Sequence, residues 1–204
     1  MSTRIPGQVI GNSGGSLAGA GNTFAANAGV ARVGANGERK SAAILNQLAA
    51  RPGGPSVLHD LSIPIPGVRA NVDHVVVSGR TITVIDTKAW SGAVYWTVAG
   101  KTFRGLKRFA VDGKGGTSYP AEKRTLPMAR TAYARHLGIP ESDIRLGLII
   151  WPTGRKRLST LLFSGAGNPK TVDGNALTVG RAGRLFGSRP ADPTILTALA
   201  RLTK

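Results

Sequence analysis

Three residues, Asp73, Asp86 and Lys88, have the types and the spacing that phosphodiester chemistry requires. Alternation along an extended strand puts Asp86 and Lys88 on one face, together with Ile82 and Val84. Charged side chains rarely lie on such an apolar face unless they are paired or bind a metal. The pattern therefore indicates a site at the end of a strand, in addition to a hydrophobic core.

Two strands joined by a tight turn must position these residues. The β-branched runs at 72–77 and 81–88 predict strands, and Ser78-Gly79-Arg80 predicts the turn between them. In such a hairpin Asp73 and Asp86 both lie towards the open end, where they can be neighbours. Two carboxylates held close together repel each other, and a divalent cation that prefers oxygen ligands relieves the repulsion.

Each of these groups then has a physical role. Asp73 and Asp86 would ligate Mg²⁺ or Mn²⁺, with the backbone carbonyl of Thr87 as a third ligand. The metal would polarise the scissile phosphate and lower the pKa of a bound water. Lys88 would hold that water and offset the negative charge that develops. Glu38, in the first turn of an expected helix, would ligate the metal or orient Lys88.

Structural explanations exist for the same residues. Asp86 and Lys88 can form an exposed ion pair at a strand end, which would stabilise the fold little. Glu38 can be a carboxylate that suits the positive end of a helix. His74 is expected to be a structural histidine on the face opposite Asp73. Spacing alone does not separate these explanations from a metal site.

Four blocks of sequence add to the spacing argument. They are Gly-Ala-Asn-Gly-Glu at 34–38, Val-Leu-His-Asp-Leu at 57–61, Asn-Val-Asp-His-Val-Val-Val at 71–77 and Val-Ile-Asp-Thr-Lys-Ala-Trp-Ser-Gly at 84–92. In this order they resemble the nuclease-related domain (NERD) family, which is placed in the PD-(D/E)xK nuclease superfamily. The resemblance covers about residues 34–151. It implies that Glu38, Asp73, Asp86 and Lys88 occupy the family's acidic and lysine positions.

Three departures from the family pattern stand out. Asp86 lies where the family often has Glu, although the superfamily pattern admits either. A family Asn-Pro-x-x-Gln block has only Tyr119-Pro120-Ala121-Glu122 as its counterpart, which argues against a role for Glu122. The C-terminal third matches no motif of the family.

The remaining pattern predicts a flexible tail at 1–33, rich in Gly, Ala, Asn and Ser, and a nuclease-related domain at 34–204. A helix should begin at Asn36 and end before Arg51-Pro52-Gly53-Gly54-Pro55. Strands are expected at 57–61, at 94–98 and 101–104 as a continuation of the sheet, and at 144–151 and 176–179. Further helices are expected at 125–137, 181–187 and 192–202. The fold class is α/β, a mixed central sheet with flanking helices and a restriction-endonuclease-like core.

The charge of the chain favours a polyanionic partner. Lys and Arg number 27 against 10 Asp and Glu, a formal charge of +17, and residues 101–157 alone hold 13 cations against four acids. Contacts to phosphate of this kind depend on salt and carry no sequence information. No sequence-reading motif is present, and no amphipathic helix supports a membrane role. The candidate nucleic-acid contacts are Arg104, Lys107, Arg108, Lys123, Arg124, Arg155, Lys156 and Arg157.

Cysteine is absent, which excludes disulfides and thiolate zinc sites and fits a reducing cytoplasm. The first residues contain no apolar run of signal-peptide length, so a cytoplasmic protein is expected. The sequence therefore predicts a Mg²⁺- or Mn²⁺-dependent nuclease that acts on nucleic acid, with DNA as the expected substrate. The alternative is a non-catalytic nucleic-acid-binding module with a nuclease-like fold. A protein partner that supplies specificity is compatible with both.

Overall fold

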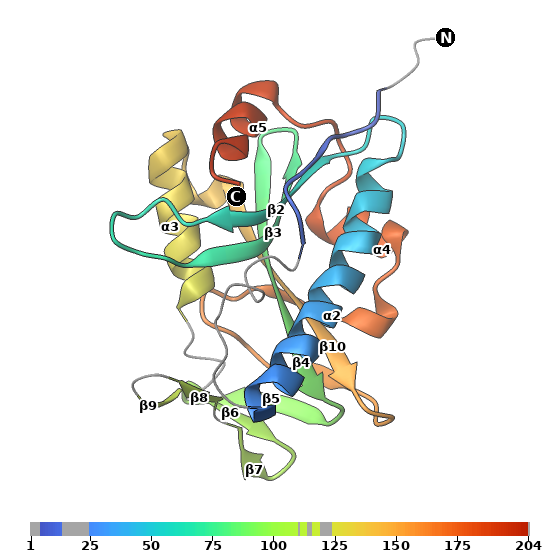
Figure 1. Cartoon of the computed structure of the whole chain (residues 1–204), viewed down its shortest axis with the longest axis vertical. Helices are drawn as coiled ribbons and strands as arrows, with labels where there is room; N and C mark the ends of the chain where they lie inside the picture. The colour runs from blue at the N-terminus through green and yellow to red at the C-terminus, as the bar shows by residue number, and fades with distance from the viewer. Residues whose placement is uncertain (1–4, 14–24, 110, 114–115, 119–123, 204) are drawn as a thin grey trace.

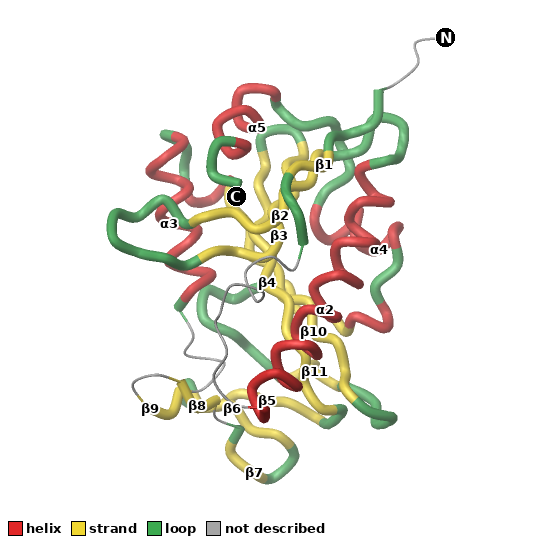
Figure 2. The backbone as a smooth tube through the Cα atoms, in the orientation of Figure 1, coloured by secondary structure: helices red, strands yellow, loops and turns green. Residues whose placement is uncertain are grey.

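A mixed six-stranded sheet forms the centre of the molecule, in the order β1-β2-β3-β4-β10-β12. The structure is a computed structural model and describes residues 5–13, 25–109, 111–113, 116–118 and 124–203 (Figures 1 and 2). Strands β1 and β2, β4 and β10, and β10 and β12 run parallel, while β3 is antiparallel to both of its neighbours. The predicted α/β fold with a mixed sheet and flanking helices is confirmed.

The described elements have the following bounds. The strands are β1 (Val9–Ile10), β2 (Ser56–Ser62), β3 (Asn71–Ser78), β4 (Thr81–Ser91), β5 (Val94–Val98), β6 (Lys101–Arg104), β7 (Lys107–Arg108), β8 (Val111–Gly113), β9 (Gly116–Ser118), β10 (Ile144–Thr153), β11 (Ser159–Leu162) and β12 (Lys170–Asp173). The α-helices are α2 (Ala25–Ala49), α3 (Thr125–Leu137), α4 (Val179–Phe186) and α5 (Pro193–Ala200), with short 3₁₀ turns at Glu141–Asp143 and Gly174–Ala176.

Helices cover both faces of this sheet (Figure 1). On one face Val75 and Val84 pack with α3 and α5, and on the other Val76 and Ile85 pack with α2 and α4. The division follows from the strand period, because successive side chains point to opposite faces. Because both faces of β3 and β4 are buried, these strands have continuous apolar runs and do not alternate between apolar and polar residues.

The β3–β4 hairpin forms as predicted. Its register pairs His74 with Ile85 and Ser78 with Thr81, and Gly79 in the turn has a φ of 58° that suits glycine. Helix α3 also ends as predicted, at Gly138 in the left-handed conformation, with Pro140 beyond it.

A second, smaller sheet lies at the opposite end of the molecule from α5 (Figure 1). Its strand order is β11-β5-β6-β7, and we call it the small sheet. The sequence correctly predicted β5 and β6, but the expectation that they continue the central sheet is wrong. Strand β4 pairs with β10 over residues 82–91 and with β3 over residues 81–85, so both of its edges are occupied over residues 82–85.

Helix α2 begins earlier than the sequence predicted. It starts at Ala25, so Asn36 lies inside the helix and does not cap it. Alanine favours helix strongly enough to carry the helix through the preceding Ala-rich residues, despite the glycines. Gly37 has a packing role, because a Cβ there would lie 3.3 Å from Trp151 Cδ1. The small residue lets α2 approach β10 closely.

The N-terminal segment also differs from the predicted flexible tail at 1–33. Residues 25–33 belong to α2, and Val9–Ile10 pair in parallel with Val57 and Leu58 of β2. Gly7 donates its backbone N–H to Ala49 O at 2.9 Å, and Val57 donates to Gln8 O at 2.8 Å. The short segment is held by this sheet edge and by the end of α2, which its composition did not reveal. Residues 14–24 lie outside the described residues.

Removing residues 1–13 is expected to lower the melting temperature by about 5 °C or more. The loss includes the backbone hydrogen bonds of Gly7, Gln8 and Ile5, each of which contributes about 0.5–1.5 kcal/mol. Thermal unfolding of the full and shortened chains, followed by circular dichroism, measures the difference. Equal melting temperatures would mean that β1 adds nothing to the stability of the sheet.

The strand expected at 176–179 is wrong as well. Strand β12 ends at Asp173, whose side chain accepts from Asn175 N at 2.9 Å and caps a 3₁₀ turn. Thr178 then caps α4 by accepting from Arg181 N at 3.2 Å. Two polar caps in six residues end the strand and begin the helix.

Candidate active site

Asp73 and Asp86 lie where the β3–β4 ladder ends. The last ladder pair is His74 with Ile85, and the two aspartates occupy the next position on each strand. There Asp73 Oδ2 accepts a hydrogen bond from the backbone N–H of Thr87 at 2.6 Å. A side-chain carboxylate thus takes the place of a backbone acceptor on the neighbouring strand.

Lys88 contacts the backbone carbonyl of Thr87, the residue whose N–H is bound by Asp73. Its Nζ lies 2.5 Å from Asp86 Oδ2 and donates to the carbonyl of Thr87 at 3.2 Å. The side chains of Lys88 and Asp86 are 28% and 16% exposed, so the ion pair is largely shielded from water. The exposed strand-end pair considered as an alternative does not fit this burial.

Electrostatics set the protonation of this group. Burial and the nearby Asp86 carboxylate raise the pKa of Asp73 to about 7, against a lowering by Lys88. Burial lowers the pKa of Lys88, but the carboxylates of Asp86 and Asp73 outweigh it and leave that pKa raised. The lysine is therefore a fixed cation, while Asp73 is a carboxylate that ionises only near neutral pH.

Glu38 of α2 belongs to the same electrostatic group. It is 8% exposed, and burial raises its pKa, with Lys88 lowering it and Asp86 raising it. Three acids thus share one ammonium in a largely buried place. A bound cation would relieve the repulsion from Asp86 that helps to raise the pKa of both Asp73 and Glu38.

A hydrogen-bonded contact fixes α2 against the strand that carries the site. Ser41, one turn after Glu38, is fully buried, and its Oγ accepts from Thr87 Oγ1 at 3.1 Å and from Trp151 Nε1 at 2.9 Å. Ser41 therefore sets the separation of α2 from β4 and β10. Sequence reasoning missed both Ser41 and Trp151, because their pairing joins residues 110 positions apart.

Replacing Ser41 with Val is expected to lower the melting temperature by several degrees. The change leaves the Thr87 hydroxyl and the Trp151 indole N–H without their partner, and an unsatisfied buried group costs about 1–3 kcal/mol. Thermal unfolding measures the loss, and Ser159→Val on the exposed edge of β11 is the control. Equal effects of the two changes would show that the Ser41 contacts contribute no stability.

Asp60 is a further acid that the sequence analysis did not select. Its neighbours pair as His59 with His74 and Leu61 with Val72, so Asp60 lies opposite Asp73 in the register. Its φ of 53° interrupts the ladder, and its carboxylate accepts from Asn71 Nδ2 at 2.8 Å. The left-handed aspartate within the strand is decided by tertiary contacts, and no local signal predicts it.

His74 packs as expected of a structural histidine on the face opposite Asp73. Its Nδ1 lies 2.8 Å from Nδ1 of His59, whose Nε2 lies 2.8 Å from Asn46 Oδ1 on α2. Burial lowers the pKa of His59 to about 4, and burial together with His59 lowers that of His74. Two neutral imidazoles therefore join β2, β3 and α2 behind the site.

The predicted basic residues gather in part around the small sheet. Arg104, Lys107 and Arg108 are exposed on β6 and β7, and residues 155–157 form the exposed loop before β11. Arg104 also donates to Ser91 Oγ at 2.9 Å. Arg124 is exposed just before α3, and Lys123, with residues 119–122, lies outside the described residues.

The donor set fits a hard divalent cation in its chemistry, although among the described residues no three His, Asp or Glu side chains gather closely enough to hold one. Lys88 Nζ touches Asp86 Oδ2 and the Thr87 carbonyl, two of the groups that the sequence predicted as ligands. The ammonium stands in for a cation at these oxygens. A metal there requires Lys88 to turn away from Asp86.

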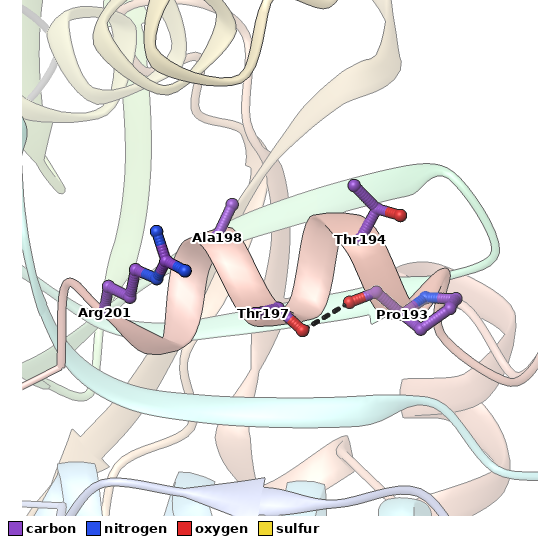
Figure 3. Close-up of a pocket in the computed structure, with 5 residues that line it drawn as sticks. All are labelled: Pro193, Thr194, Thr197, Ala198 and Arg201. Carbon is purple, nitrogen blue, oxygen red and sulfur yellow. Dashed lines mark hydrogen bonds between the residues drawn. The ribbon is translucent and has the colours of Figure 1, made fainter.

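A shallow depression along α5 is separate from this acidic group. It is lined by Pro193, Thr194, Thr197, Ala198 and Arg201, and Thr197 Oγ1 donates to Pro193 O at 2.8 Å (Figure 3). Its lining contains no carboxylate, so it offers no counterpart to the Asp73–Asp86–Lys88 group.

Comparison with known proteins gives one family match. The model of the family described as nuclease-related domain (NERD) matches residues 33–125, a segment that contains Glu38, Asp73, Asp86 and Lys88. No curated protein and no solved structure matches the chain. Within the described residues, no helix is long and apolar enough to cross a membrane.

Proposed function

We propose that the protein is a divalent-metal-dependent phosphodiesterase that hydrolyses nucleic acid, with DNA as its expected substrate, because residues 33–125 match the nuclease-related domain family. The observation that carries the proposal is the contact group around Thr87. Asp73 binds its N–H, Lys88 binds its carbonyl, and Asp86 pairs with Lys88. An acidic pair with a lysine beside it matches the needs of phosphodiester hydrolysis.

Asp73 and Asp86 would hold Mg²⁺ or Mn²⁺ together with the Thr87 carbonyl. Glu38 does not gather with both aspartates closely enough to ligate the same cation, and it would instead orient Lys88. Bound there, the metal supplies Lewis-acid polarisation of the phosphate and a water of lowered pKa. Lys88 then has two tasks. It would release Asp86 Oδ2 for the cation, and its ammonium would hold the attacking water and balance the charge that develops on the phosphate.

Glu38 acts from a different element. It lies on α2, whereas the other three residues lie on one hairpin, so the Ser41 contacts with Thr87 and Trp151 govern its approach. The positive charge of the chain assists substrate capture, because +17 attracts a polyanion over a long range. Phosphate contacts from exposed Arg and Lys give binding that is tolerant of sequence.

Incubation with plasmid, linear duplex and single-stranded DNA tests the proposal, each with Mg²⁺, Mn²⁺ or chelator. Cleavage that requires the metal supports it. Binding that weakens steeply with salt, without any cleavage, would favour the non-catalytic binding module. A parallel set of RNA substrates decides whether DNA is the preferred polymer.

A further inference from the structure

The outer face of the small sheet is apolar and aromatic, yet it is not covered by another described element. On β5 the buried Tyr95 points inward, while Val94 and Val98 are 53% and 51% exposed. Strand alternation places Trp96 on the same outer face as these two valines. The register pairs Trp96 with Phe103, and their rings stack with centroids 4.3 Å apart at 15°.

Further exposed leucines lie on this face or next to it in the sequence. Leu162 of β11 pairs with Trp96 and is 69% exposed, and its neighbour Leu161 is 91% exposed. Leu106, in the turn between β6 and β7, is 97% exposed. An exposed apolar patch of this kind usually marks a binding surface.

Charge identifies the kind of partner. Residues 87–111 and 144–172, which supply all four strands, contain no Asp or Glu. Lys101 pairs with Val98 and Arg108 with Phe103, so both cations lie on the outer face beside the aromatic stack. The face therefore combines rings and apolar side chains with positive charge alone.

We propose that the outer face of the small sheet binds single-stranded nucleic acid, with Trp96 and Phe103 stacking on bases and Lys101 and Arg108 contacting phosphates. Bases in a duplex are paired and stacked, so this face can reach them only in a single strand. The choice of nucleic acid as the polyanion rests on the proposed function. The binding itself requires no cleavage, so the two proposals can fail separately.

The inner face explains how this surface is held rigid. Tyr95 packs with Trp90, Phe163 and Ile150 in a buried cluster, and Trp96 Nε1 donates to Gly105 O at 2.8 Å. Trp90 and Lys88 lie on the same strand, β4. The packed cluster thus connects the small sheet to the strand that carries the candidate site.

The test measures the affinity of the full chain in chelator, so that no substrate is cut. Fluorescently labelled oligothymidylate of about 20 nucleotides is compared with an abasic strand of equal length and with a duplex. We expect oligothymidylate to bind at least about fivefold more tightly than the abasic strand, because base stacking adds about 1–3 kcal/mol per base. Trp96→Leu should remove most of that advantage and leave abasic and duplex affinities unchanged.

Controls separate stacking from charge and from folding. Trp96→Phe keeps an aromatic ring and should retain the preference, while Val68→Ala removes an exposed apolar side chain between β2 and β3 and should have no effect. Arg108→Ala should weaken binding to the abasic strand and oligothymidylate alike, and Arg201→Ala, at the C-cap of α5, should change neither. Thermal unfolding of each variant verifies the fold.

Equal affinity of the parent for abasic and thymidylate strands would overturn the proposal. So would an equal loss of duplex binding in Trp96→Leu, since bases in a duplex are out of reach. Binding of the parent and of Trp96→Leu to vesicles containing phosphatidylserine is measured as well, because an anionic membrane is the other partner that an apolar, positively charged face could bind. Vesicle binding that Trp96→Leu abolishes, together with unchanged oligothymidylate binding, would assign the face to an anionic membrane instead.

Discussion

Asp86→Asn is expected to lower the rate of metal-dependent DNA cleavage at least about a hundredfold while DNA affinity in chelator is kept. The substitution preserves the shape of the side chain and removes the charge that the site needs for a cation. The basic surface around the small sheet is untouched. Cleavage and affinity therefore separate in this variant, and gel-based nicking together with fluorescence anisotropy measures both.

Lys88→Ala should also abolish cleavage, by another route. It keeps the carboxylates of Asp73 and Asp86, so a divalent cation should still bind and raise the melting temperature. Asp86→Asn should lose that thermal shift. Glu141→Gln is the matched control, because Glu141 pairs with Arg130 at 3.1 Å on the surface, away from the site.

Several outcomes would contradict this assignment. If the parent cuts DNA and Asp86→Asn cuts equally well, the site lies elsewhere even though the activity is real. If Asp86→Asn and Lys88→Ala both behave like the parent in cleavage and in metal-induced stabilisation, their ion pair is only structural.

Asp73→Asn is expected to stabilise the protein at pH 8 in chelator, by about 5 °C, while it abolishes cleavage. The folded-state pKa of Asp73 is about 7, well above its ordinary value. Between these two pKa values the folded protein binds more protons than the unfolded chain, so stability falls as pH rises. Above pH 7 Asp73 is ionised in the folded protein, and the resulting loss in the free energy of unfolding is nearly complete. Asn at this position cannot ionise, so it avoids that loss, while its side-chain oxygen still accepts from Thr87 N–H.

Melting curves of the parent and of Asp73→Asn at several pH values measure this effect. The two proteins should have similar melting temperatures near pH 4, where Asp73 is protonated in the folded state, and should diverge up to pH 8. Mg²⁺ should raise the melting temperature of the parent at pH 8 more than that of the variant. A variant less stable than the parent at pH 8 would mean that the ionised Asp73 is favourably paired.

This expected gain in stability has a functional meaning. The ionised Asp73 is expected to destabilise the fold, yet a negative charge is the property that a cation site requires. If Asp73→Asn stabilises the protein, then the carboxylate of Asp73 does not serve stability, and a functional role is the better explanation for the cluster of Asp73, Asp86 and Glu38. The melting temperature of Asp73→Asn therefore tests the functional assignment without requiring the natural substrate.

The sequence by itself determined the β3–β4 hairpin and the positions of Asp73, Asp86 and Lys88 along it. Residues 71–91 contain two β-branched runs and a Ser-Gly-Arg turn, so pairing, register and the proximity of Asp73 to Asp86 follow from local rules. The same holds for α3, whose end at Gly138 is set by a residue that adopts positive φ at little cost.

Only the tertiary structure decided what surrounds the hairpin. The pairing of Val9–Ile10 with β2, the early start of α2 and the separation of the small sheet depend on contacts between distant segments. Ser41 and Asp60 reach the site region for the same reason. Composition and periodicity describe what a segment prefers, whereas packing against a particular neighbour decides which preference is realised, because burial on folding outweighs local propensity.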